Sequence, residues 1–169
     1  SRDWFGDVSP YAPEAAITVE GEMLHFAFRC GKAPLCDERM APGEFVEGLW
    51  EQDVAEFFVA GPGPGYQEIN IAPTGAWWCC LFSGYRERQE VVVFTPEINT
   101  HRTANSWSVN FRVPLQHLRP WRGIKSEERL FSACSILHDP EPHYFAWNHE
   151  TGGEPDFHRR DLFRPLPGS

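Results

Sequence analysis

Residues 48–88 read GLWEQDVAEFFVAGPGPGYQEINIAPTGAWWCCLFSGYRER, and they contain three strand candidates separated by two turns. Each candidate is a short run rich in aromatic and β-branched side chains, which is typical of strands. The intervening runs GPGPG and PTG carry the glycine and proline residues that mark turns. The three candidates are residues 53–59, 66–72 and 76–83. Together they predict an antiparallel meander, which usually presents one face to solvent or to a ligand.

Polar side chains alternate with apolar ones along the second strand candidate. Tyr66, Glu68 and Asn70 point to one face, because successive side chains of a strand point to opposite faces. Trp50 and Glu56 share one parity in the preceding segment if that strand begins early. The register decides whether the two polar sets lie on one face. If they do, the face offers carboxylates, an amide and aromatic rings, which suits a polyhydroxylated ligand.

Four segments carry a resemblance to a known family. LWEQDVAEFFVA, YQEINIAPTGAWW, GYRER and the later PDFHRRDLF resemble the bacterial DOMON-like proteins, which are relatives of the family 9 carbohydrate-binding modules. The resemblance covers about residues 17–163. It implies an all-β fold, an antiparallel β-sandwich of the DOMON and family 9 type, that binds sugar or, in some branches, haem. Because one fold hosts many functions, the resemblance bears more strongly on the fold than on the ligand.

Length and composition agree with one domain that has its own core. The chain has 169 residues, with 15 Pro and 14 Gly that divide it into short segments, and we expect residues 1–169 to form a single β-sandwich domain. The formal net charge of −9 argues against a nucleic-acid partner, since no basic stripe offsets it. No apolar run is long enough to suggest a membrane span. We also expect no signal peptide in this chain, and the sequence leaves the oligomeric state open.

The five cysteines form no regular framework. Cys79 and Cys80 are adjacent in a strand candidate, so their side chains point to opposite faces and do not bridge each other. An odd count without regular spacing predicts mostly free thiols and slightly favours a cytoplasmic location. A local disulfide between Cys30 and Cys36 is the alternative.

The rest of the chain supplies further strand candidates. Residues 17–30 predict a hairpin that turns at residues 20–22, and residues 107–114 alternate cleanly between apolar and polar side chains. Phe111 lies on the apolar parity of that second run. The remaining predictions are a buried strand at 90–94, a loop at 96–105, a helical turn at 115–122, strands at 130–137 and 143–147, and docking of Leu162, Phe163 and Leu166 on the core.

Trp50 and Trp147 are the principal candidates for ligand contact. The resemblance implies a sugar held between two tryptophans, one just before the strand at residues 53–59 and one near the C-terminal end. Trp50 matches the first by its place in LWEQDVAE, and Trp147, followed by the polar Asn148, matches the second by position. A tryptophan ring stacks on the C–H face of a pyranose and excludes water. The alternative is that both are core residues.

Glu56, Asn70 and Arg112 are the polar candidates. The resemblance implies a carboxylate six residues after the first tryptophan, where Glu56 stands. A charge between apolar strand residues is costly to bury without partners, so a salt bridge from Glu56 to Arg112 or Arg86 is the alternative role. Asn70 and Arg112 offer donors in geometries that suit sugar hydroxyls. The alternative to ligand contact is that Asn70 and Arg112 lie on a solvent-exposed strand face.

Metal and cofactor chemistry has weaker support in the sequence. None of the seven histidines falls at a zinc-protease spacing, and His158 in PDFHRRDLF has a structural role by the resemblance. Haem needs axial ligands such as Met and His, and Met23 and Met40 match no haem motif. Calcium accompanies the family 9 modules, but the chain has no Asp-rich loop. We therefore predict no cofactor and no metal site, with haem and calcium as alternatives.

Binding without catalysis is the function that the sequence favours. The chain has no nucleophile elbow, phosphate loop or triad signature. Glu56 and Glu68 form a conceivable glycosidase pair, but their local sequence favours binding equally. The sequence therefore predicts a non-catalytic, carbohydrate-binding module-like domain for a small sugar or oligosaccharide. A haem-binding redox domain and a protein-interaction domain without a sugar site are the alternatives.

Overall fold

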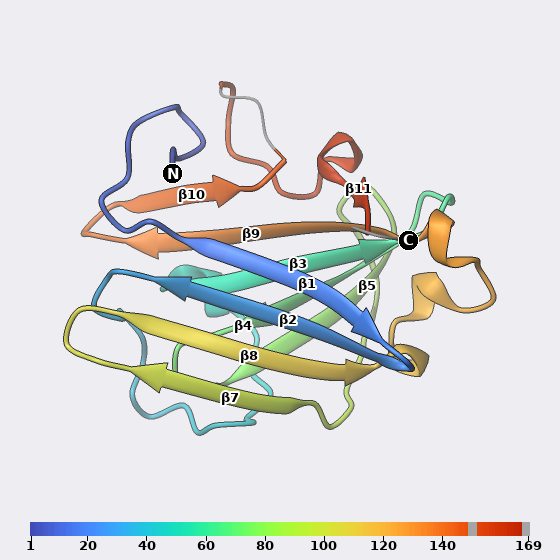
Figure 1. Ribbon diagram of the computed structural model, residues 1–169, viewed down its shortest axis with the longest axis horizontal. Coiled ribbons are helices and arrows are strands. Elements are labelled where there is room, and N and C mark those ends of the chain that lie inside the picture. The colour runs from blue at the N-terminus through green and yellow to red at the C-terminus, as the bar shows by residue number, and fades with distance from the viewer. Residues whose placement is uncertain (149–151, 167–169) are drawn as a thin grey trace.

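Two antiparallel sheets pack face to face in the computed structural model, which describes residues 1–148 and 152–166 (Figure 1). The smaller sheet has the strand order β1-β2-β8-β7. Its hairpin turns between Glu20 and Met23, as the sequence predicts. The strands of this sheet are β1 (Glu14–Glu20), β2 (Met23–Cys30), β7 (Glu97–Arg102) and β8 (Trp107–Pro114).

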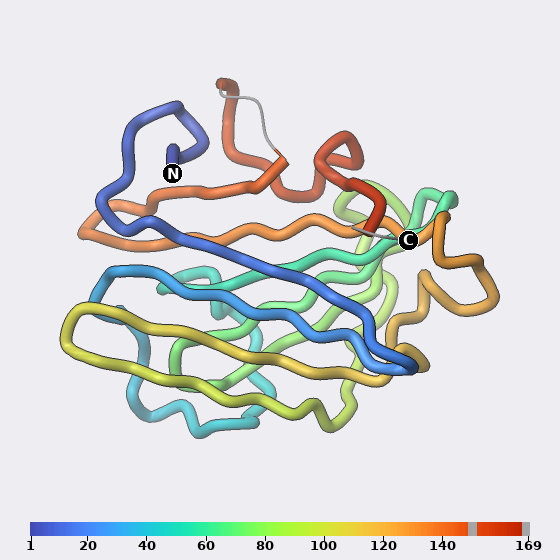
Figure 2. The backbone as a smooth tube through the Cα atoms, in the orientation of Figure 1, coloured from blue at the N-terminus to red at the C-terminus, as the bar shows by residue number. Residues whose placement is uncertain are grey.

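The larger sheet has the order β10-β9-β3-β4-β5-β6, and the short β11 pairs with β9. The predicted meander forms its centre, since β3, β4 and β5 pair consecutively (Figure 2). The strands are β3 (Val54–Ala60), β4 (Tyr66–Ile71), β5 (Trp77–Gly84), β6 (Glu87–Val91), β9 (Leu130–His138), β10 (Pro142–Ala146) and β11 (Arg164–Pro165). The two sheets confirm the predicted all-β sandwich.

The helices are single 3₁₀ turns that connect the strands. The predicted helical turn at 115–122 corresponds to two of them. Within the described part of the chain, none is long and apolar enough to cross a membrane. They are η1 (Leu49–Glu51), η2 (Leu115–His117), η3 (Arg119–Trp121), η4 (Ser126–Glu128) and η5 (Arg160–Leu162).

The main core lies between the two sheets. Phe111 of β8 is fully buried, and its ring centroid is 5.6 Å from that of Phe57 on β3. Phe26 of β2 packs on the same Phe57 ring at 4.7 Å. The buried side chains of β8 are those of the predicted parity: Trp107, Val109, Phe111 and Val113. The alternation in sequence therefore identified the inward face of this strand correctly.

A second hydrophobic layer covers the opposite face of the larger sheet. Every residue of β3 and β4 is buried, because the N-terminal and C-terminal segments lie over the face that the smaller sheet leaves free. Trp4 and Phe157 come from these two segments, and their ring centroids lie 5.7 Å apart. Figure 1 shows both segments beside β10. Leu162 and Phe163 dock in this layer and Leu166 in the main core, as predicted.

A buried ion pair fixes the start of β3. The carboxylate of Asp53 is fully buried and accepts hydrogen bonds from Nζ of Lys32 at 2.8 Å and from the backbone N–H of Leu35 at 2.9 Å. The backbone N–H of His138, at the end of β9, donates to the same carboxylate at 2.7 Å. Three hydrogen bonds compensate much of the desolvation of this charge. They tie β3 to the loop that precedes it and to its neighbour β9.

Two predictions about the edges of the sheets are wrong. Residues 90–94 are not a buried strand: β6 spans Glu87–Val91, every residue of it is exposed, and the nearby Val93 is 67% exposed. The apolar run suggested burial, but β6 is an edge strand. Residues 96–105 are not a loop, since β7 occupies Glu97–Arg102 and pairs with β8. Its polar composition concealed a strand because an edge strand with one solvated face needs few apolar residues.

The cysteines are free, as predicted, and Cys30 and Cys36 are not bridged. Cys79 lies in the main core, while Cys80 lies in the second hydrophobic layer. Their opposite orientations follow from the alternation of strand side chains.

Candidate functional site

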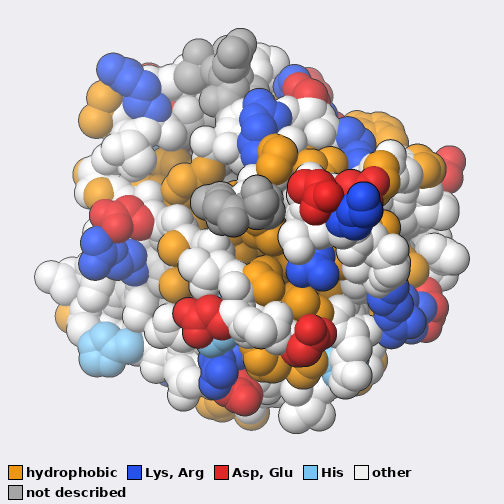
Figure 3. All heavy atoms as spheres, turned by 45° about the vertical axis from the view of Figure 1, so that its right-hand side comes forward, with side chains coloured by type: hydrophobic (Ala, Val, Ile, Leu, Met, Phe, Trp, Pro, Cys, Tyr) orange, Lys and Arg blue, Asp and Glu red, His pale blue; other side chains and the backbone are white. Residues whose placement is uncertain are grey.

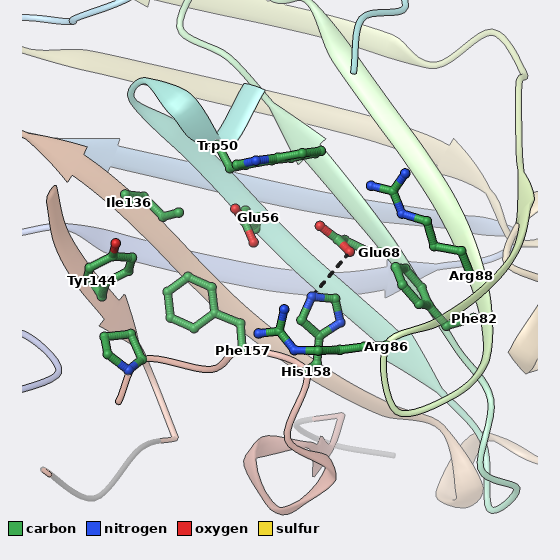
Figure 4. Close-up of a pocket in the computed structure, with 11 residues that line it drawn as sticks. Trp50, Glu56, Glu68, Phe82, Arg86, Arg88, Ile136, Tyr144, Phe157 and His158 are labelled. Atoms are coloured by element: carbon green, nitrogen blue, oxygen red, sulfur yellow. Dashed lines mark ion pairs between the residues drawn. The ribbon is translucent and has the colours of Figure 1, made fainter. Parts of the chain in front are cut away.

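A cavity of about 350 Å³ opens on the second hydrophobic layer, over the centre of the larger sheet. Two glutamates form its floor and aromatic side chains form its walls (Figure 4). The strands β3, β4, β5 and β9 supply Glu56, Glu68, Phe82 and Ile136, while β6, β10, η1 and the connecting segments supply the rest. The other lining residues are Trp50, Arg86, Arg88, Tyr144, Pro155, Phe157 and His158.

The register of β3 and β4 brings the two floor glutamates to one face. Glu56 lies directly opposite Asn70, and Phe58 lies directly opposite Glu68. Residues opposite each other in an antiparallel pair share a face, and residues two apart on a strand do so as well. Glu68 and Asn70 therefore share a face, as the strand alternation predicted, and the register adds Glu56 to the same face. This register settles the question that the sequence left open.

Glu56 is buried without a partner. Its side chain is 3% exposed, and among the described residues no donor forms a hydrogen bond or ion pair with its carboxyl group. Burial, followed by the nearby charge of Glu68, raises the pKa of Glu56 well above its ordinary value. An unpaired buried carboxylate is so costly that the group takes up a proton instead. The proposed salt bridges from Glu56 to Arg112 or Arg86 do not form.

Glu68 retains some polar support. Nδ2 of Asn70 donates a hydrogen bond of 2.9 Å to Oε1 of Glu68. Burial raises the pKa of Glu68 to about 7, and the hydrogen bond from Asn70 and the charges of Arg88 and Arg86 oppose that rise. Near neutral pH this carboxyl group therefore exists in both protonation states. The floor of the cavity carries at most about one negative charge between its two carboxyl groups.

His158 reaches the floor from the C-terminal segment through a chain of polar contacts. The hydroxyl of Tyr66 accepts a hydrogen bond from the backbone N–H of Arg86 at 3.0 Å and lies 2.7 Å from Nδ1 of His158. That hydroxyl can donate to Nδ1, and the tautomer of the neutral imidazole that accepts this hydrogen bond carries its proton on Nε2. Nε2 lies 3.9 Å from Oε2 of Glu68. Burial lowers the pKa of His158 to about 4, so the ring is neutral at physiological pH.

Trp50 is positioned by a turn that requires glycine. Gly48, which precedes η1, has a φ of 88°, a left-handed conformation that other residues adopt at a cost. The half-buried Trp50 ring packs edge-on against Trp78 at 5.6 Å. The guanidinium group of Arg88 lies 5.9 Å from the Trp50 ring and 5.1 Å from the Trp78 ring. Cation–π contacts of this kind hold the wall of the cavity in place.

The two arginines at the cavity each have a carboxylate of their own. Arg86 pairs with Asp156 at 2.9 Å, and Arg88 pairs with Glu47 at 2.5 Å. On the face shown in Figure 3, basic and acidic side chains similarly lie next to one another. The arginine charges are thus largely balanced at the rim of the cavity. They do not form ion pairs with Glu56 or Glu68.

The structure brings together some of the predicted site residues and separates others. Trp50 and Glu56 line the cavity, and Asn70 lies next to them on the floor strands. Arg112, Trp147 and Asn148 do not line it.

Arg112 belongs to the smaller sheet, where it pairs with Glu97 at 2.6 Å on the solvent face. Arg112 therefore does not lie with Glu56 in this cavity, and its prediction as a co-ligand has no support from the geometry. Trp147 is 37% exposed and packs edge-on against Phe28 of the smaller sheet, with ring centroids 6.3 Å apart. Asn148 follows it, and its Nδ2 is buried without a hydrogen-bond partner. Trp50 lines the cavity, whereas Trp147 packs on the smaller sheet, so these two tryptophans do not enclose a ligand between them here.

Sequence reasoning missed most of the cavity wall. On the floor, Glu68 has a strand parity that identifies it as a candidate. His158 lies in the quoted segment PDFHRRDLF, for which the resemblance implies a structural role. Its contact with Tyr66 does tie the last segment to the sheet, but the ring also lines the cavity. No local signal distinguished Phe82, Tyr144 and Phe157 from ordinary core aromatics.

The donor set does not suit haem or calcium. No group of three or more His, Cys, Asp or Glu side chains able to hold a metal ion occurs in the part of the chain that the structure describes. Axial ligation of haem by a Met and a His would need a methionine at the cavity, and neither Met23 nor Met40 lines it. The carboxyl groups at the floor suit the hydrogen-bond donors of a small polar molecule better than they suit haem or calcium.

Comparisons with known proteins agree with the fold. No protein-family model matches the chain, and no curated protein matches its sequence. A solved structure from Bacteroides uniformis ATCC 8492, for which carbohydrate binding has been proposed, has a similar fold with a TM-score of 0.69. The similarity covers 91% of this chain and 78% of that chain at 15% sequence identity. At this identity, the comparison establishes a shared sandwich fold.

Proposed function

We propose that the chain is a non-catalytic binding domain that holds a small carbohydrate in the cavity over β3 and β4. The observation that carries this proposal is the meeting of Trp50 with the buried carboxyl groups of Glu56 and Glu68 in one cavity of about 350 Å³. That volume falls in the range of small-molecule sites, which run from roughly 300 to 1,000 Å³. The fold agrees with a relationship to the DOMON and family 9 sandwiches, which we include in the proposal.

The cavity combines the two kinds of contact that a sugar needs. The ring of Trp50 offers an apolar surface for the C–H face of a pyranose. Glu68 accepts hydroxyl hydrogen bonds, and the protonated Glu56 can either donate or accept them. Sugars are heavily hydrated, so each hydrogen bond to the protein replaces one to water and adds little net free energy. We therefore expect a Kd on the order of 1 μM to 1 mM, equivalent to roughly −8 to −4 kcal/mol.

The placement of the carboxyl groups favours binding over hydrolysis. A glycosidase uses two carboxyl groups that flank the scissile bond from opposite sides. Here both groups extend from neighbouring strands of one floor (Figure 4). Burial also raises the pKa of both, and the charge of Glu68 raises that of Glu56 further, so neither is the firmly ionised nucleophile that a retaining enzyme requires. The proposal is therefore one of recognition.

The two terminal segments support a single structural unit. They meet over the larger sheet, where the backbone N–H of Trp4 donates to the carbonyl of Tyr144 at 2.7 Å and Phe157 packs on the Trp4 ring. Residues from the first segment to the last thus cover the same face. We propose that residues 1–169 form one domain on this basis.

Titration calorimetry against mono- and disaccharides tests the proposal. Trp50→Ala should abolish binding while the melting temperature stays close to that of the wild type. Trp147→Ala is the matched control, because this tryptophan lies outside the cavity, and it should leave binding unchanged. The proposal fails if no sugar in a broad panel binds, or if Trp147→Ala abolishes binding and Trp50→Ala does not.

A further inference from the structure

The floor of the cavity is rich in hydrogen-bond acceptors and poor in donors. Glu56 is only 3% exposed, and its carboxyl group has no hydrogen-bond or ion-pair partner among the described residues. Glu68 receives one hydrogen bond at Oε1, while its Oε2 is 3.9 Å from the nearest histidine nitrogen. Beside them, Oδ1 of Asn70 is buried without a partner. A ligand that brings donors would satisfy this floor better than one that brings acceptors.

Within residues 1–148 and 152–166, no Lys or Arg side chain forms an ion pair with Glu56 or Glu68. Arg86 and Arg88 are the nearest positive charges along the wall, and each is paired with a rim carboxylate, Asp156 or Glu47. His158 is neutral, since burial lowers its pKa to about 4. A buried carboxylate gains most from a positively charged donor, because charge-assisted hydrogen bonds are about twice as strong as neutral ones.

Aromatic rings surround the same carboxyl groups. Figure 4 shows Glu56 and Glu68 between the ring of Trp50 on one side and the rings of Phe157 and His158 on the other. Faces of aromatic rings attract cations, and such walls with carboxyl groups are a common means of binding ammonium groups. The contact between Arg88 and the Trp50 ring shows that this wall accommodates positive charge.

We propose that the ligand carries a protonated amine, so that the cavity selects an amino sugar over a neutral sugar of the same size. The ammonium group lies between Glu56 and Glu68, and the sugar ring lies against Trp50. The positive charge favours the ionised form of both carboxyl groups, so its three donors meet their unpaired oxygens. An ammonium group has donors and no acceptor, which matches this floor. The inference rests on the proposed carbohydrate-binding function and names the substrate class of that site. A sugar acid is the class that the carboxyl pair disfavours.

Calorimetry with matched sugars tests the inference. The probes are glucosamine, N-acetylglucosamine, glucose and glucuronic acid, together with the same four sugars of the galacto series. N-acetylation removes the charge of the amine while the ring is kept. The amino sugar of at least one series should bind about tenfold more tightly than its parent hexose, which corresponds to one charge-assisted hydrogen bond of about 1.4 kcal/mol.

Two variants assign that preference to the floor. Glu68→Gln should reduce the ratio of the affinity for the amino sugar to that for its parent hexose to near one. Glu56→Gln provides a second test if Glu68→Gln does not fold. Glu97→Gln is the matched control, because Glu97 pairs with Arg112 on the other sheet, and it should keep the preference. Circular dichroism establishes that each variant is folded.

The outcomes separate this inference from the proposed function. If neutral hexoses or sugar acids bind as tightly as amino sugars, the amine inference is overturned and carbohydrate binding stands. If no sugar of either series binds, both are overturned. A preference for amines that survives both glutamine variants would also overturn the inference, because the charge would then be recognised elsewhere.

Discussion

Nε2 of His158 lies 3.9 Å from Oε2 of Glu68, although the two residues stand 90 positions apart in the chain. This contact joins the C-terminal segment to the central strands and closes the cavity on one side. Tyr66 holds the imidazole in place through Nδ1, so that its other nitrogen faces the carboxyl group. The last segment of the chain therefore shapes a site whose floor comes from the middle of the sequence.

The buried Glu68 should make the stability of the protein depend on pH. Burial raises its pKa to about 7 from an ordinary value of 4.5, so between these values the folded state retains a proton that the unfolded state loses. The stabilisation is full below pH 4.5 and is lost as the pH rises through 7. At about 1.4 kcal/mol for each pKa unit, the loss is on the order of 3 kcal/mol.

Glu68→Gln removes this titration. The free energy of unfolding, measured by urea denaturation at pH 5 and pH 8, should fall more steeply for the wild type than for the variant. The lowered pKa of His158 affects both proteins alike and cancels in the comparison. Parallel pH profiles for the two proteins would contradict a raised pKa of Glu68.

Tyr66→Phe should weaken the attachment of the C-terminal segment. The change removes the hydrogen bond to His158 and the acceptor for the backbone N–H of Arg86 while keeping the buried ring. We expect a loss of about 1–3 kcal/mol in the free energy of unfolding. Tyr144→Phe is the control: no hydrogen bond of its hydroxyl is found among the described residues, so the change should cost less than about 0.5 kcal/mol. Equal losses in both variants would argue against the Tyr66 network.

Phe111→Ala tests the core between the sheets. Phe111 is fully buried against Phe57 and Trp77, and truncating a buried aromatic should cost roughly 3–5 kcal/mol. Phe5→Ala is the matched control, since Phe5 is 56% exposed, and it should change stability by less than about 0.5 kcal/mol. Chemical denaturation measures both. A loss below about 1 kcal/mol for Phe111→Ala would place this face of β8 outside the core.

Thiol titration tests the cysteine assignment. The denatured, unreduced protein should show five thiols, because all five cysteines are free. In the native protein Cys36 should react first, since it is only half-buried, whereas Cys134 is fully buried and burial raises its pKa well above the ordinary value. A titre of three in denaturant would reveal one disulfide and contradict the assignment.

Much of the fold could be predicted because alternation is a local property of a strand. The parity of Tyr66, Glu68 and Asn70 and that of the apolar side chains of β8 were both correct. The edges were harder, since β7 is polar and β6 carries exposed valines. An edge strand has fewer neighbours, so its composition indicates less about its pairing.

The site was only partly predictable, because parity places a side chain on a face but does not assign the strand to a sheet. Arg112 has the expected outward parity, yet its face belongs to the smaller sheet. Trp147 matched by position, but it packs against Phe28 instead of the cavity. His158 gained its place from Tyr66, 92 residues away, and no local pattern encodes a contact of that separation.

The most direct test of the account is an NMR titration that follows the seven tryptophan indole N–H signals while sugar is added. The signals of Trp50 and Trp147 are assigned from the spectra of Trp50→Ala and Trp147→Ala. We predict that a binding sugar shifts the Trp50 signal progressively to saturation and leaves the Trp147 signal in place. A shift of Trp147 without Trp50, or no shift of Trp50 with any sugar of the panel, would contradict carbohydrate binding in this cavity.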